Sequence, residues 1–325
     1  MENTNCPICS GNARNVFQLH CSKYDQSLLY TEIRIMCCVE CGHIFNYLTD
    51  MEKADLKNYY NTEYTLSNAY SQTKKMDDVR IENSIKFIDG AEPIIYVDQV
   101  LEHELDLNAF FEKIKKGLNP NSYLYIGVPD ILRYEKYDFF NPYWVIMREH
   151  IHHFDKFHVE LLAKKHGFKL VKSMEDSLPL MNDVMLMPNL QLLFQYDGDT
   201  NISNIPSSSL SALFSIAMYL KNSAARIQHI VDNILKDKII YFWGASRELL
   251  FIYPFFKEFL NKKIIDNNEY KQKNLTLDGN TIHDESLLHN LEKNSVVVIT
   301  ATAHSKILTE KLRNEFDYKG DILKI

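Results

Sequence analysis

The stretch that decides the fold is residues 92–103, EPIIYVDQVLEH, taken together with residues 123–130, YLYIGVPD. Each contains a short apolar run that stops at an aspartate, Asp98 in the first and Asp130 in the second. Between them, apolar residues recur at helical spacing from Leu107 to Leu118. A strand, an amphipathic helix and a second strand in this order predict a βαβ unit with two parallel strands.

The polar residues that follow the two predicted strands mark the place to look for a ligand site. In an open parallel sheet, ligands bind beyond the carboxyl ends of the strands. Residues 98–103 and 129–130 lie at those ends. Further along, residues 148–168, REHIHHFDKFHVELLAKKHGF, place a run of histidines before a predicted helix that begins near Asp155.

The whole chain has the composition of a globular protein. Its 325 residues suffice for two or three domains, and 46% of them are hydrophobic against 24% charged. The net charge of −7 argues against a general binder of nucleic acid or of a membrane surface. No apolar run reaches transmembrane length, and the first residues, MENTNCPIC, do not have the pattern of a signal peptide. We therefore expect a cytoplasmic protein with reduced thiols.

All six cysteines lie within the first 41 residues. Cys6 and Cys9 form one C-x-x-C pair, and Cys38 and Cys41 form another. Two such pairs can place four thiolates around one tetrahedral ion, for which zinc is the usual choice. Because four protein ligands leave no open coordination position, the predicted zinc is structural rather than catalytic. Cys37 adjoins Cys38 and offers an alternative ligand.

These motifs together resemble a known family. Residues 100–130 resemble the second half of a class I S-adenosylmethionine (SAM) methyltransferase domain, where a "vLEH" loop, a helix, a turn and a strand ending "vPd" follow one another. Residues 148–168 resemble a later segment of the sugar C-methyltransferases, and the two cysteine pairs resemble the zinc module that begins those enzymes. The resemblance implies SAM as cofactor and a nucleotide-linked sugar, or a related surface-glycan precursor, as substrate.

The first half of such a domain is missing from the pattern. In the family, a glycine-rich turn after the first strand holds SAM, and an acidic residue after the second strand binds its ribose. The interval from Ile44 to Ile95 contains a single glycine, Gly90, and no G-x-G pattern occurs anywhere in the chain. Without those glycines the backbone cannot approach the cofactor closely, and we expect a truncated sheet with an open edge. Asp98, Gln99 and Glu102 are the candidate cofactor-binding residues that remain.

The run REHIHH, which begins at Arg148, is the richest group of acid–base residues. A histidine titrates near neutral pH, and a neighbouring carboxylate can orient it as a general base. In sugar C-methyltransferases a Tyr-His-Glu-His run lies beside the substrate. Glu149 and His150 match its last two positions, whereas Met147 and Arg148 replace the first two. The resemblance makes Glu149 and His150 the catalytic candidates and His153 a substrate contact. A polar cap on the next helix, and a metal site shared by His150 and His153, stay open as alternatives.

Two smaller features have competing interpretations. We interpret the pair Glu102–His103 as chiefly structural, with ligand contact as the alternative. A group of tyrosines either lines a substrate pocket or covers the open sheet edge, and the residues alone do not decide. The group consists of Tyr59, Tyr60, Tyr64 and Tyr70.

A second α/β unit is predicted near the C-terminus. Three apolar runs read as parallel strands separated by helical segments, at residues 238–243, 262–266 and 295–303. This order favours a small Rossmann-like sheet. Gly244 before a helix and Asp266 after the next strand suggest a nucleotide-type site and are candidate substrate contacts, with a packing turn as the alternative. The arrangement is similar to the C-terminal domain of the sugar C-methyltransferases, which helps to frame their nucleotide-sugar site.

The predicted fold class is α/β, with a zinc knuckle at the N-terminus. We expect a zinc module over residues 1–50, a truncated methyltransferase-like Rossmann sheet over 51–200, a connecting helix over 201–236 and a Rossmann-like domain over 237–325. The first functional hypothesis is SAM-dependent methylation of a small molecule. The alternative is an inactive relative that binds a sugar nucleotide or partners an active enzyme, and a third class is a zinc-bearing interaction module. A second copy or a partner enzyme would cover the shortened sheet, and neither nucleic acid nor membrane is expected as a partner.

Overall fold

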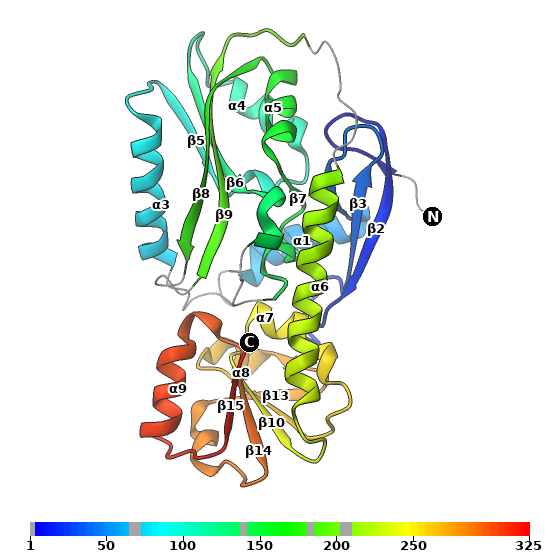
Figure 1. The fold of residues 1–325 in the computed structure, drawn as a ribbon, viewed down its shortest axis with the longest axis vertical. Coiled ribbons are helices and arrows are strands. Elements are labelled where there is room, and N and C mark those ends of the chain that lie inside the picture. The colour runs from blue at the N-terminus through cyan, green and yellow to red at the C-terminus, as the bar shows by residue number, and fades with distance from the viewer. Residues whose placement is uncertain (1–3, 65–72, 137–141, 181–184, 202–209) are drawn as a thin grey trace.

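The computed structural model describes residues 4–64, 73–136, 142–180, 185–201 and 210–325. Within these residues the chain forms three sheets with helices packed against them, so the prediction of a mixed α/β protein is confirmed (Figure 1). No helix in these ranges combines the length and the apolar character needed to cross a bilayer.

The first sheet is antiparallel and contains the cysteine module. Its order is β1 (Thr4–Asn5), β2 (Asn12–His20), β3 (Glu32–Cys38), β4 (Ile44–Tyr47) and β7 (His152–His153). The last of these strands comes from the histidine run, with Ile44 opposite His153 and Phe45 opposite His152. The histidine run is therefore anchored on the cysteine module by backbone pairing. Helix α1 (Asp50–Thr62) follows the sheet and begins at a capping box made by Thr49 and Glu52.

The second sheet contains the βαβ unit that the sequence predicts. Its order is β5 (Ile94–Asp98), β6 (Tyr123–Pro129), β9 (Met185–Tyr196) and β8 (Phe168–Leu180). Strands β5 and β6 are parallel, with Asp98 opposite Gly127, and the hairpin β8–β9 adds antiparallel strands beside β6. Helix α4 (Leu107–Lys115) makes the crossover and begins at Asp106, whose carboxylate accepts a hydrogen bond from the amide of Ala109.

Helices cover both faces of this sheet (Figure 1). The core on one face joins residues of α4 and α5 (Lys156–Lys165) with Ile8 and the cysteines of the first module. On the other face, α3 (Thr73–Ile88) packs Phe87 against Tyr125 and Leu193. Among the described residues, β5 pairs with β6 alone, so its outer edge carries no strand.

The third sheet is the predicted C-terminal Rossmann-like unit. Its order is β12 (Thr276–Leu277), β13 (Asn280–His283), β11 (Lys262–Ile265), β10 (Ile239–Trp243), β14 (Ser295–Ile299) and β15 (Asp321–Lys324). All its pairings are parallel except β12 with β13. Its helices are α7 (Arg247–Ile252), α8 (Glu269–Asn274) and α9 (Ser305–Asn314). Of the helical segments expected between its strands, the one before β14 is a short 3-10 helix, η5, over Glu285–Asn290.

Helix α6 (Leu210–Asp232) connects the second and third sheets and runs along both parts of the molecule (Figure 1). Its Tyr219 and Ile216 share one hydrophobic core with Tyr134 of the second part and Phe242 of the third. A loop of the first module also reaches the third sheet. The amide of Ser22 donates to Leu250, and the phenol of Tyr24 donates to the carbonyl of Ala245. The parts are thus fused by a continuous core.

Candidate functional site

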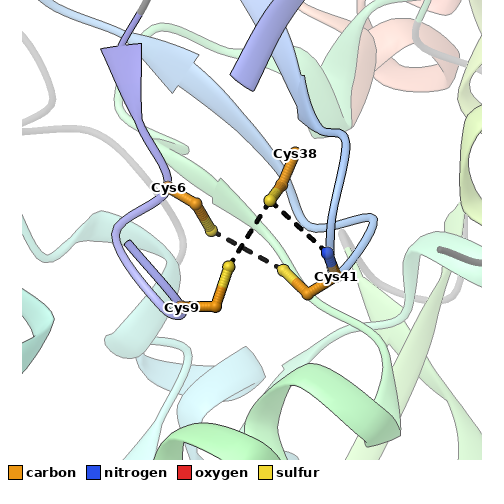
Figure 2. A group of neighbouring side chains, drawn as sticks. All are labelled: Cys6, Cys9, Cys38 and Cys41. Carbon is orange, nitrogen blue, oxygen red and sulfur yellow. Dashed lines mark hydrogen bonds between the residues drawn. The ribbon is translucent and has the colours of Figure 1, made fainter. Parts of the chain in front are cut away.

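The four cysteines of the two C-x-x-C pairs converge, as Figure 2 shows. Cys6 and Cys9 come from the turn after β1, while Cys38 ends β3 and Cys41 lies in the turn that follows it. The Sγ atoms of Cys6 and Cys41 are 3.7 Å apart, and those of Cys9 and Cys38 are 3.5 Å apart. A tetrahedral zinc with Zn–S bonds near 2.3 Å holds its sulfurs about 3.8 Å apart, so the group is compatible with zinc.

The surroundings of the cysteines also suit a metal. The contact with Cys41 lowers the pKa of the Cys6 thiol to about 5, which favours a thiolate in the group. His158, which Asp155 orients, hydrogen-bonds through Nε2 to the backbone carbonyl of Cys41 at 2.9 Å. Of the two adjacent cysteines, Cys38 lies within the group, whereas the sulfur of Cys37 contacts the Cys38 carbonyl instead.

The residues directly after β5 make a tight, polar turn. The side chain of Asp98 lies over Gly127, where a Cβ would be 2.1 Å from its Oδ1. Gln99 has a left-handed backbone with φ 53°, and its amide donates to the carbonyl of Gly127. Its side chain donates to Asn189 of β9 at 3.0 Å. Asp98 and Gln99 therefore face the centre of the sheet, and their role in cofactor binding stays a prediction.

The turn continues into a short 3-10 helix, η1 (Leu101–His103), which meets the histidine run. The amide of Ile151 donates to the carbonyl of Glu102 at 2.7 Å, and this places His150 beside Glu102 and His103. One ligand atom from each of these three side chains lies within 4.8 Å of the other two. The side chains that meet His150 are thus those of Glu102 and His103. The metal interpretation of the sequence paired His150 with His153, which is not part of this group.

The ring nitrogens of these histidines have defined partners. Nδ1 of His103 is 2.7 Å from the carbonyl of Glu149, and Nδ1 of His150 is 3.1 Å from the carbonyl of Val145. A carbonyl only accepts, so both rings carry their proton on Nδ1 and a lone pair on Nε2. Burial lowers the pKa of both rings, which keeps them neutral.

His153 belongs to the framework of the module. It lies in β7, with Nε2 3.4 Å from Oδ1 of Asn46 and Nδ1 3.4 Å from the phenol of Tyr134. Burial, with His152 beside it, lowers its pKa to about 3. Its predicted role as a substrate contact stays a prediction, and these hydrogen bonds account for its orientation.

Glu149 is buried and forms an ion pair with Arg247, whose Nη1 is 3.5 Å from its Oε1. The guanidinium lies over the ring of Trp144 and donates to the sulfur of Met147. Burial alone would lower the pKa of Arg247, but the carboxylates of Glu149 and Glu248 raise it. Sequence reasoning missed this arginine. The sequence does contain a signal for it, because Arg247 begins the helix after strand β10, and ligands of α/β sheets bind at the carboxyl ends of the strands.

Gly244 and Asp266, the two predicted substrate contacts in the third sheet, interact with other residues of the third sheet. Gly244 has φ 119°, and a Cβ there would be 2.5 Å from the amide nitrogen of Ala301. The carboxylate of Asp266 accepts from the amide of Ala245 at 2.7 Å and pairs with Lys271. These contacts match the packing-turn alternative, and a substrate role for Gly244 and Asp266 stays a prediction.

Three of the four tyrosines lie at the end of α1, and their rings contact one another. Burial and the nearby carboxylate of Glu149 raise the pKa of the Tyr60 phenol. The tyrosines therefore lie near the Glu149–Arg247 pair. Tyr70 falls outside the described residues.

The usual SAM cradle of a class I methyltransferase does not fit the described residues. That cradle needs a strand beyond β5 and a glycine-rich turn after it. In the described ranges the outer edge of β5 has no strand, and the segment before β5 consists of the helices α1 and α3. Of that cradle, the described residues contain the part contributed by the turn after β5.

Comparison with known proteins finds a family model that matches the central segment. The family model described as a methyltransferase domain matches residues 45–173. No match to this chain was found among the curated proteins. The matched segment contains β5, α4, β6 and α5, the elements that the sequence resemblance uses. The match therefore supports a class I SAM-dependent methyltransferase domain over residues 45–173.

Proposed function

We propose that this methyltransferase-family protein acts on a small polar molecule, a nucleotide-linked sugar or a related glycan precursor. The observation that carries the proposal is the Glu149–Arg247 ion pair. The backbone carbonyl of Glu149 accepts a hydrogen bond from His103, which lies in the turn after β5. Arg247 is the first residue of the helix that follows β10. Parallel strands of the second and third sheets thus end near one pair of charged side chains, and ligands bind at such strand ends.

The residues around this pair suit such a substrate. The side chain of Arg247 is 30% exposed, and a guanidinium binds a phosphate through paired N–H donors. The carboxylate of Glu149 would accept a hydrogen bond from a substrate hydroxyl and orient it. His150 is neutral, but its lowered pKa makes it a weak base, so we assign it to binding rather than to proton removal.

The second candidate is an inactive relative that binds a sugar nucleotide or an active enzyme. It is favoured by the short sheet, whose β5 edge carries no strand in the described ranges. In this case the edge would be covered by a second copy of the chain or by the partner enzyme, because open edges invite pairing.

Calorimetric titration separates the two candidates. Active methylation requires saturable binding of SAM or S-adenosylhomocysteine, whereas the second candidate requires binding of a nucleoside diphosphate sugar without SAM. In both cases Arg247→Gln should weaken binding of the sugar nucleotide at least tenfold, because the phosphate loses its guanidinium. Arg14→Gln, on the exposed side of β2, is the matched control. Unchanged sugar-nucleotide binding by Arg247→Gln would rule out this site.

We also propose that Cys6, Cys9, Cys38 and Cys41 hold a structural zinc. The metal would cross-link the turns after β1 and β3 and so support the sheet on which the histidine run is anchored. Elemental analysis should find one zinc per chain in the native protein. Cys38→Ser should lose it, whereas Cys37→Ser should keep it.

A further inference from the structure

The cluster of Glu102, His103 and His150 has the composition of a metal site that is distinct from the four cysteines. It contains two imidazoles and one carboxylate, the donor set that divalent transition ions accept. Glu102 and His150 are buried, at 1% and 5% exposure, while the side chain of His103 is 30% exposed. The cluster is therefore shielded on two sides and reaches solvent on the side of His103.

The two imidazoles are oriented as metal ligands usually are. A ligating histidine typically donates its second N–H to a carbonyl or carboxylate, which fixes the tautomer and aims the lone pair at the ion. Here the carbonyls of Glu149 and Val145 take the Nδ1 protons of His103 and His150. Both carbonyls belong to the segment just before β7, so one backbone stretch orients both rings.

The hydrogen bonds of the two rings also decide what an ion would meet. With the Nδ1 protons directed at backbone carbonyls, each ring has its lone pair on Nε2. A bound divalent ion would therefore face two imidazole nitrogens and one carboxyl group.

We propose that Glu102, His103 and His150 bind a divalent transition-metal ion. Bonds of about 2.0–2.1 Å hold the ligand atoms of a tetrahedral ion about 3.3 Å apart. Nε2 of His103 is 3.9 Å from Oε1 of Glu102, and all three ligand atoms lie within 4.8 Å of one another. These separations exceed the ideal value, so the ligand atoms would have to move closer together when the ion binds.

Such a site would differ in kind from the cysteine site. Four thiolates saturate an ion, whereas three ligands leave a position for water or for a substrate oxygen. The Glu149 carboxylate comes from the residue beside His150, so an ion here would lie next to the proposed acceptor site. This last role, holding and polarising a substrate oxygen, rests on the proposed function; the binding of the ion does not.

Cobalt is the probe that tests the proposal, because its visible spectrum distinguishes nitrogen and oxygen ligands from thiolates. Co²⁺ is titrated into zinc-quantified native protein in the absence of SAM and substrate, with Mn²⁺ and its paramagnetic resonance signal as a second probe. We expect one equivalent beyond the zinc, with weak bands and no thiolate charge-transfer absorption. Glu102→Gln and His103→Ala should each weaken the binding of this second cobalt ion at least tenfold.

Two controls keep the test decisive. His229→Ala removes an exposed histidine of α6 and should bind cobalt like the native protein. His103→Ala alters a half-exposed side chain, so it remains informative if Glu102→Gln fails to fold. Equal cobalt affinity in native protein and His103→Ala, or uptake at the thiolates alone, would overturn the proposal. Because no SAM is present, failure here is distinguishable from failure of the proposed function.

Discussion

The turns that follow β5 and β10 occupy equivalent places after a parallel strand but differ in structure. Each leaves a parallel strand, passes a polar residue and leads into a helix. After β10, the Asp266 carboxylate and the Lys271 ammonium fill the turn, and both bind the backbone of Ala245. After β5, the side chains of Glu102 and His103 instead meet His150 from a distant part of the chain. The comparison teaches that a ligand-type turn becomes a candidate site only where its polar groups converge with others.

The largest expected effect concerns the filled turn. Asp266→Ala leaves the amides of Ala245 and Asn268 without their acceptor and Lys271 without its carboxylate. We expect a loss of about 3–5 kcal/mol in the free energy of unfolding, measured by chemical denaturation. Asp284→Ala, which removes an exposed helix cap, should cost about 1 kcal/mol. Equal losses would mean that the turn is not held by Asp266, and a ligand role would regain support.

The next effect concerns Gly244. Its substitution by alanine adds a Cβ at φ 119°, 2.5 Å from the amide nitrogen of Ala301, so the backbone of the turn must move. We expect a loss of about 3 kcal/mol in the same measurement. Gly279→Ala is the control, because φ is 72° there but no atom lies within 4 Å of the added Cβ. That variant should lose about 1 kcal/mol. If Gly244→Ala and Gly279→Ala lost the same free energy of unfolding, close packing against Ala301 would not be the reason for a glycine at position 244.

An intermediate effect is the pH dependence of stability that His153 contributes as a buried framework residue outside the cluster after β5. Its pKa of about 3 in the folded protein lies below the usual 6.5, so the unfolded chain binds its proton first as pH falls. Its contribution to stability is present above pH 6.5 and is lost between about pH 6.5 and pH 3. Between pH 7.5 and 5.0, the native protein should therefore lose about 2 kcal/mol more than His153→Gln. Parallel losses in the two proteins would contradict a buried, neutral His153.

The smallest expected effect is on the stability of the cluster itself. His103→Ala removes one hydrogen bond to the carbonyl of Glu149 from a half-exposed side chain. Without added metal, the free energy of unfolding should fall by about 1 kcal/mol or less. A loss as large as that of Asp266→Ala would show that the turn after β5 is a structural element like the turn after β10.

The sequence predicts the local elements of this fold well, and physical chemistry explains why. Apolar runs and helical spacing identify β5, α4 and β6, because those signals lie within a few residues of one another. Asp155 caps α5, as its position predicts. The chain breaks its helix near Pro254, where the 3-10 helix η4 (Tyr253–Phe256) takes over from α7.

Features that depend on distant partners escape the sequence. Strand β7 consists of two residues whose partners in β4 lie more than 100 positions earlier, and no local pattern announces it. Strands β2 and β3 of the first module lie outside the predicted elements, although β3 alternates buried and partly buried residues over most of its length. The meeting of Glu149 with Arg247 depends on the packing of two sheets. Composition and spacing identify donor groups, while long-range pairing selects which of them meet.

The loop between β2 and β3 has a consequence for the order of assembly. Asp25 is held by Thr276 and by the amides of Asp278 and Gly279, which are made about 250 residues later. During synthesis the turns that contain the cysteines are made early. The contacts of this loop with residues 276–279 can form only after most of the chain has been made. Such a contact closes a very long loop and forms late. A chain that stops short of residue 276 lacks these partners of Asp25, so we expect the loop between β2 and β3 to open more readily in it.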